Sequence, residues 1–258
     1  MSDLQNVLSA KVADGKKLFV PYITGGLPSP QVFVDLFGGL ATHADAIEVG
    51  VPFSDPIMDG PVIQASSTKA LEMGVTPESC FGLIKEALRY SQVPVVVMTY
   101  YNPILQMGEA EFVQSLLKTG VGGVITPDLP FEESTQLSDG LSRAGLAHIQ
   151  MVAPSTSPER AAMLARASTG FVYGVSRLGV TGERQELAEA AREVVARIRP
   201  HAVAPVMLGV GISTPDQAAT AAGFADGVIV GSALVKLVLS GDIEGALALA
   251  SDIRKELG

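Results

Sequence analysis

Residues 44–50 read Ala-Asp-Ala-Ile-Glu-Val-Gly, and residues 51–61 continue as Val-Pro-Phe-Ser-Asp-Pro-Ile-Met-Asp-Gly-Pro. A short apolar run with a β-branched centre, closed by glycine and proline, predicts a β-strand over residues 44–49. The connection over residues 50–61 is longer than the usual connection of about 2–6 residues between a strand and the next helix. A loop of this length after a buried strand indicates a functional surface more often than padding.

Short strand patterns of this kind alternate with longer helical patterns over the whole chain. Apolar residues spaced i, i+3 and i+4 predict helices over 31–40, 79–90, 109–117, 186–198 and 215–222. Four predicted helix starts carry a Ser-Pro or Thr-Pro pair, at residues 29–30, 76–77, 157–158 and 214–215. The predicted strands are 18–23, 44–49, 93–98, 123–126, 148–152, 171–175, 205–208 and 227–230.

Eight strands, each followed by a helix and with no linker between them, predict an α/β fold: a single (β/α)₈ TIM barrel domain over residues 1–258. A doubly wound open sheet is the alternative, but it usually has fewer strands at this length. We expect an extra N-terminal helix over residues 3–12, which could cover the barrel floor. A short extra helix is expected over 232–238, after the eighth strand.

Composition excludes several classes of function. The chain has 18 Lys and Arg against 27 Asp and Glu, and the resulting net charge of −9 argues against nucleic acid or an anionic membrane as a partner. The single cysteine, Cys80, permits no disulfide within the chain and fits a reducing, cytoplasmic setting. No apolar run approaches the roughly 18 residues that span a bilayer. We therefore expect a cytoplasmic protein with a large core.

The histidines and lysines limit the chemistry further. His43, His148 and His201 stand before or at the start of predicted strands, so we expect turn or surface positions at the bottom of the barrel. Active sites of such barrels lie at the opposite end. No lysine ends a predicted strand, where an imine-forming lysine would project. Neither a metal site nor covalent imine catalysis is expected.

Carboxylates remain as candidates at the top of the barrel. Side chains alternate along a strand, so Ala46 and Glu48 face the interior if Ile47 and Val49 face the helices. Burial there would raise the pKa of Glu48 and let it act as acid and base in turn. The alternative is a glutamate satisfied by neighbouring strands. For Asp59, the sequence alone favours capping of the next helix over chemistry.

Two glycine-rich turns follow the seventh and eighth strands, at residues 209–215 and 231–236. TIM barrels often bind phosphate there, because glycine lets backbone N–H groups approach and a helix N-terminus favours negative charge. Simple tight turns are the alternative. Several tyrosines gather at the same end of the predicted barrel: Tyr22, Tyr100, Tyr101 and Tyr173. Together these features predict a pocket for a flat apolar group linked to a phosphate.

Residues 47–64 resemble the signature of the tryptophan synthase α subunit family, and residues 98–103, 127–130 and 176–182 support this resemblance. It covers nearly the whole chain. The resemblance implies a lyase that cleaves indole-3-glycerol phosphate to indole and glyceraldehyde 3-phosphate. It also implies an α₂β₂ complex with a β subunit that holds pyridoxal phosphate, with no cofactor in this chain.

The resemblance also assigns residues. Glu48 and Asp59 take the positions of the catalytic carboxylates. The substrate-binding positions are Tyr22, Tyr100, Ile125, Tyr173, Thr181, Gly182, Val210, Gly211, Gly231 and Ser232. Of these, the backbone at Gly182, Gly211, Gly231 and Ser232 resembles the phosphate site. Tyr22 and Val210 differ from the phenylalanine of other members.

Three other functions stay open at this point. The first is a stand-alone lyase without a β partner, against which the long loop over residues 52–61 argues, because it resembles the partner surface. The second is a catalytically silent barrel that activates a partner, and intact Glu48 and Asp59 argue against it. The third is another phosphosugar barrel, which would not explain the Pro-Phe-Ser-Asp-Pro sequence. We also expect the glycine-rich connection over 174–183 to act as a lid.

Overall fold

The structure is a computed structural model that describes residues 2–175, 184–209 and 211–258, without the side chains of 184–188. Eight parallel strands close into a barrel in sequence order, which confirms the predicted fold class. The strands are β1 (Leu18–Thr24), β2 (Ile47–Gly50), β3 (Val95–Met98), β4 (Gly123–Ile125), β5 (Ala147–Val152), β6 (Val172–Val175), β7 (Val206–Gly209) and β8 (Gly227–Val230).

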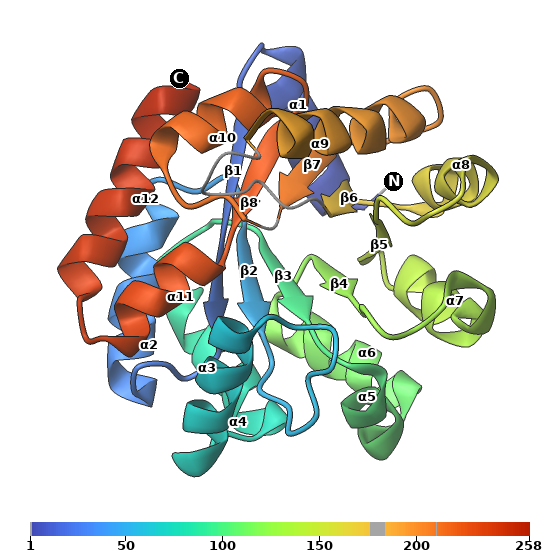
Figure 1. The fold of residues 1–258 in the computed structure, drawn as a ribbon. Coiled ribbons are helices and arrows are strands. Elements are labelled where there is room, and N and C mark those ends of the chain that lie inside the picture. The colour runs from blue at the N-terminus through green and yellow to red at the C-terminus, as the bar shows by residue number, and fades with distance from the viewer. Residues whose placement is uncertain (1, 176–183, 210) are drawn as a thin grey trace.

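Helices surround the barrel (Figure 1). They are α1 (Asp3–Ala13), α2 (Pro30–Ala41), α3 (Pro61–Glu72), α4 (Pro77–Ala87), α5 (Tyr101–Met107), α6 (Glu109–Thr119), α7 (Thr135–Arg143), α8 (Pro158–Ala167), α9 (Arg184–Ile198), α10 (Pro215–Ala222), α11 (Ser232–Leu239) and α12 (Ile243–Leu257), with a 3₁₀ turn η1 (Phe131–Glu133). The four predicted caps are confirmed, because Ser29, Thr76, Ser157 and Thr214 each accept a hydrogen bond from a backbone N–H in the first turn.

The barrel closes between its first and last strands. β1 pairs with β8 from Leu18 opposite Gly227 to Pro21 opposite Val230, and Figure 1 shows the blue and orange-red ribbons side by side. The pairing joins segments more than 200 residues apart in the sequence. All the strand ends that carry the candidate residues therefore meet at one rim.

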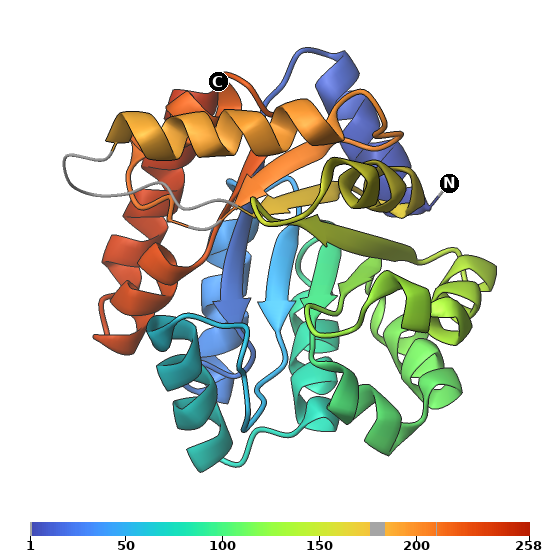
Figure 2. The same ribbon diagram turned by 45° about the vertical axis from the view of Figure 1, so that its right-hand side comes forward.

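The core has two layers, inside and outside the strands. Ile47 and Val49 of β2 pack in the outer layer against the helices, whereas Ala46 belongs to the inner layer. Leu4 and Leu8 of α1 also pack in the inner layer. Figure 2 shows α1 at the end of the barrel away from the arrowheads of β1 and β2. The extra N-terminal helix thus covers the barrel floor, as expected.

Several element boundaries shift by up to three residues from the sequence predictions, and two differences have a clear physical reason. β2 begins at Ile47 rather than at residue 44, because the chain bends at Asp45 and Ala46, where the Asp45 N–H donates to the Phe19 carbonyl oxygen. His148 is buried rather than at the surface: its Nδ1 lies 2.8 Å from the Ser138 Oγ of α7. Burial lowers the pKa of His148 to about 4. Among the helices of the described residues, none has the length and hydropathy to cross a bilayer.

Candidate active site

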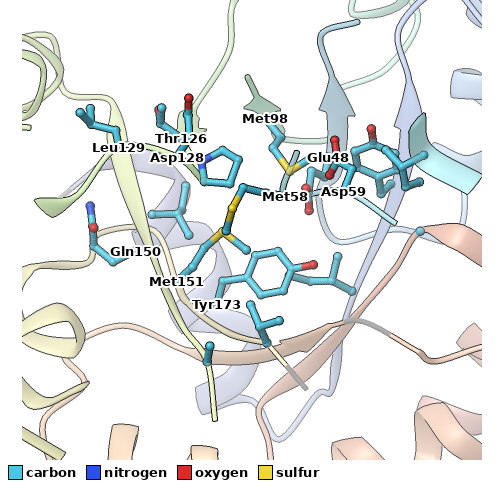
Figure 3. A pocket seen from close by; sticks show the side chains of 18 of the residues that line it. Glu48, Met58, Asp59, Met98, Thr126, Asp128, Leu129, Gln150, Met151 and Tyr173 are labelled. Atoms are coloured by element: carbon cyan, nitrogen blue, oxygen red, sulfur yellow. The ribbon is translucent and has the colours of Figure 1, made fainter. Parts of the chain in front are cut away.

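A cavity of about 680 Å³ opens at the carboxyl ends of the strands, the end at which TIM barrels place their active sites. Figure 3 shows side chains from β2, β3, β5 and β6 and from the loop before α3 meeting in it. Seven of the predicted site residues line the cavity: Tyr22, Glu48, Asp59, Tyr173, Gly211, Gly231 and Ser232.

Glu48 is the most deeply buried carboxylate of the cavity. It lies on β2 opposite Tyr22 of β1 and Val96 of β3, and its side chain is 1% exposed. No group of the described residues makes a hydrogen bond with its Oε2 atom, so the alternative of a glutamate satisfied by neighbouring strands is wrong. Burial raises the pKa of Glu48 to about 8, and the charge of Asp59 adds to the shift. At neutral pH the carboxyl group therefore carries a proton.

Asp59 comes from the loop between β2 and α3 and lines the cavity with Glu48. The N-cap of α3 is Gly60, without a side-chain cap, so the capping interpretation of Asp59 is wrong. Desolvation raises the pKa of Asp59 to about 6, against the opposing effect of a hydrogen bond with Tyr100. The two carboxylates thus differ in pKa, an arrangement that suits an acid and a charge-stabilising group.

Tyr100 holds the loop in place. Its hydroxyl accepts a hydrogen bond of 2.9 Å from the Met58 N–H, and its ring stacks on Phe53 with 5.2 Å between centroids. Tyr100 does not line the cavity, and neither does Ile125, which is buried in the inner core layer. Both lie beside the site rather than at its surface.

Tyr22 and Tyr173 form part of the cavity wall, and each takes the space that a glycine leaves. A Cβ atom on Gly50, at the end of β2, would lie 2.0 Å from the Tyr22 hydroxyl oxygen, and one on Gly209 would lie 2.4 Å from that of Tyr173. Burial raises the pKa of both tyrosines, so both stay neutral. The glycines at these strand ends therefore make room for aromatic walls.

Gly211, Gly231 and Ser232 line the cavity beside Ile212. Ser232 begins α11, and Gly231 is its N-cap, so the first backbone N–H groups of the helix have no partner within it. The backbone at Gly211 has a φ of +83°, which glycine adopts without strain. Thr181, Gly182 and Val210 lie outside the described residues, and so does the predicted lid except for Gly174 and Val175, which end β6.

The sequence analysis missed several residues that line the cavity, among them Met58, Ile63, Met98, Asp128 and Met151. A signal for two of them was present. Met98 follows the interior residue Val96 on β3, and Met151 follows the interior residue Ile149 on β5, each by two positions. The same alternation that singled out Glu48 would have found both. Across the described residues, no group of three or more histidine, cysteine or acidic residues could hold a metal ion.

A closed barrel with two acidic side chains of raised pKa at the carboxyl ends of its strands belongs to the TIM-barrel enzymes. A more specific assignment comes from known proteins. The family profile described as tryptophan synthase alpha chain matches residues 8–253. The chain belongs to the tryptophan synthase alpha chain family.

Individual relatives agree with this assignment. The tryptophan synthase alpha chain of Halalkalibacterium halodurans is 45% identical, over 93% of this chain and 90% of that one. The alpha chain of Streptomyces avermitilis is 41% identical, over 98% and 93%. Among solved structures, tryptophan synthase from M. tuberculosis superposes with a TM-score of 0.90 at 36% identity, covering 100% of this chain and 99% of that one.

Proposed function

We propose that the cavity at the carboxyl end of β2 is where this lyase of tryptophan biosynthesis cleaves indole-3-glycerol phosphate to indole and glyceraldehyde 3-phosphate. The observation that carries the proposal is Glu48, a buried carboxylate with an unpartnered oxygen on the wall of a mostly apolar cavity. A carboxyl group kept protonated by burial is a general acid at neutral pH.

Glu48 would supply the proton that the reaction needs. Protonation at indole C3 turns the ring into an iminium-like electrophile. The bond between C3 and the side-chain carbon then breaks, and its electron pair restores the aromatic ring. The hydroxyl on that carbon loses its proton as it becomes the aldehyde of glyceraldehyde 3-phosphate. The carboxylate that Glu48 becomes after the first step can accept this proton, so one residue serves as acid and then as base.

Asp59 would stabilise the positive charge that develops on the indole ring. A carboxylate facing the ring N–H strengthens its interaction as charge builds up there, which lowers the barrier more than it tightens substrate binding. The lower pKa of Asp59, about 6 against about 8 for Glu48, supports this division of roles. Between these two pKa values Asp59 is ionised while Glu48 is still protonated.

The phosphate would bind at the other end of the cavity. Gly211 and Gly231 lack side chains that would keep an anion from the backbone, and the N-terminus of α11 at Ser232 favours negative charge. Tyr22 and Tyr173 would enclose the indole ring between the two ends. Tyr100 would act on the site through the loop that carries Asp59 rather than on the substrate.

We also propose the assembly in which the chain works: an α₂β₂ complex in the cytoplasm, with pyridoxal phosphate in the β subunit and no cofactor in this chain. Family membership supports the subunit over the stand-alone lyase. The loop between β2 and α3, in which Ile57 is 77% exposed, is the proposed contact. We propose further that residues 1–258 form one domain, because the β1–β8 pairing joins both ends of the sequence.

The deciding experiment follows indole release from indole-3-glycerol phosphate by the purified chain, with and without a β subunit. We expect slow release by the chain alone and strong activation by the β subunit. No release in either case would contradict the lyase assignment, and equal rates would contradict the complex. A single-turnover measurement on the isolated chain separates a slow catalyst from a silent barrel.

A further inference from the structure

Three methionines meet in the cavity from three different elements. Met98 ends β3, Met151 lies near the end of β5, and Met58 precedes Asp59 in the loop before α3. Figure 3 shows their sulfur atoms turned toward the middle of the cavity, between Tyr173 on one side and the two carboxylates on the other. The reaction proposed above assigns them no chemistry. Their position places them where the indole ring would bind.

The stiffness of the barrel interior changes at this level. Below Met98 the inner layer holds Val96, and below Met151 it holds Ile149, both branched at Cβ and restricted in rotamer. Methionine is unbranched, has three rotatable bonds and fills spaces of irregular shape. The branched residues Val96 and Ile149 therefore hold the strands rigidly. The methionine side chains above them, which would contact a bound ring, can change rotamer.

Met58 combines a fixed backbone with a free side chain. Its N–H donates to the Tyr100 hydroxyl at 2.9 Å, whereas the residue is 61% exposed. Met98, by contrast, is only 9% exposed. The three residues thus form a wall with one movable side chain at the mouth and a buried one beside Glu48, and thioether sulfur contacts aromatic rings favourably.

We propose that Met58, Met98 and Met151 form an adaptable wall that sets which indole rings the site accepts, so that the chain takes indoles with a methyl or chloro substituent on the benzene ring as well as indole itself. This inference rests on the proposed function, since it names the substrate class of the same cavity. A wall of stiff side chains would admit the unsubstituted ring and exclude the larger ones, because close-packed side chains with restricted rotamers cannot move aside for an extra substituent.

The test runs the reaction in reverse, with glyceraldehyde 3-phosphate and indole or a ring-substituted indole. In this direction the aldehyde carbon bonds to indole C3, the C3 proton is lost and the aldehyde oxygen gains a proton. The measured quantity is kcat/KM for 5-methylindole, 6-methylindole and 6-chloroindole, each divided by that for indole. We expect ratios within about tenfold of one for the unaltered chain.

The variants replace flexible side chains by branched ones of similar size. In the double variant Met98→Ile/Met151→Ile we expect the ratios to fall at least about tenfold, because isoleucine is branched at Cβ. In Met98→Leu/Met151→Leu we expect a smaller fall, because leucine is less restricted than isoleucine. Met207→Leu is the control: Met207 is fully buried in the inner layer and does not line the cavity, so its ratios stay unchanged.

Because each ratio is taken within one variant, a general loss of activity or of folded protein cancels. Ratios that stay constant in both double variants, or fall as far in the Met207→Leu control, would overturn the adaptable wall. Ratios far below one for the unaltered chain would overturn it as well. An unaltered chain that fails to condense indole itself contradicts the lyase function, and the proposal fails with it for that distinct reason.

Discussion

Two buried carboxylates stand three residues apart on one segment and have opposite environments. Asp45, 7% exposed, accepts hydrogen bonds from Lys11 Nζ at 2.7 Å, from Arg254 Nη1 at 2.9 Å and from the Phe19 N–H at 2.8 Å. Glu48, 1% exposed, has an oxygen that finds no partner in the described part of the chain, and its pKa is raised to about 8. The first carboxylate joins α1, β1 and α12 at the floor of the barrel, whereas the second faces the cavity at its top.

The difference shows what separates a structural carboxylate from a reactive one. Burial alone does not decide, since both side chains are buried. The neighbouring groups decide: two cations and a backbone N–H satisfy the charge of Asp45, whereas the charged group that acts on Glu48 among the described residues is the carboxylate Asp59, which disfavours its charged form. Removing each group should therefore affect a different property of the protein.

The largest effect is expected for catalysis in Glu48→Gln. The amide has a similar shape but cannot give or take the proton at indole C3, so indole release should fall by about 10³-fold or more. The circular dichroism spectrum and the elution volume should not change. Residual cleavage near the original rate would refute the role of Glu48. Glu133→Gln, a change at an exposed carboxylate, is the control and should retain full activity.

The next effect is on stability, and it depends on pH. The raised pKa means that the folded state holds a proton that the unfolded state loses above about pH 4.5. Stability therefore decreases as pH rises from about 4.5 to about 8. Glu48→Gln removes this penalty, so its advantage in free energy of unfolding should grow by about 3–4 kcal/mol between pH 5 and pH 8.5.

Urea unfolding of the original chain and of the variant at both pH values measures this change. An advantage that is the same at pH 5 and pH 8.5 would contradict the raised pKa of Glu48. The Glu133→Gln control should show no such growth.

Asp45→Asn should have the reverse consequence, a loss of stability without a loss of chemistry. Lys11 and Arg254 would lose their shared counter-charge, at a cost of about 1–3 kcal/mol at pH 7. The cost stays moderate because both cations are partly exposed and can be rehydrated. Urea unfolding measures the loss, and indole release per folded molecule should match the original chain. A strong fall in that rate would show that the two ends of the barrel are coupled.

The smallest effect is expected for Lys11→Met. Arg254 and the Phe19 N–H continue to satisfy Asp45, and the methionine keeps the apolar stem of the lysine. We expect a loss below about 1 kcal/mol that decreases further in 1 M salt. A loss as large as that of Asp45→Asn would mean that Lys11 alone stabilises the floor carboxylate.

Local sequence patterns predicted much of this molecule, and particular residues show which features they could not predict. The caps at Ser29 and Thr214 and the inward direction of Glu48 involve neighbours within a few residues, so the sequence reveals them. The burial of His148 was missed, because its partner Ser138 comes from the helix that packs outside β5. The cap of α3 was assigned to Asp59, since Asp before Gly-Pro is common turn chemistry, but Gly60 takes that position.

The amino-acid order by itself determined the eightfold alternation of strand and helix, the interior face of β2 and the glycine-rich turns after β7 and β8. Each of these depends on periodicity or on turn chemistry, which act over a few residues. Only the tertiary structure decided which of two nearby carboxylates has partners, because Arg254 reaches Asp45 from 209 residues away. It also brought Met58, Met98 and Met151 into one wall. Alternation along the strands turns Met98 and Met151 inward, but only closure of the barrel brings them together with Met58.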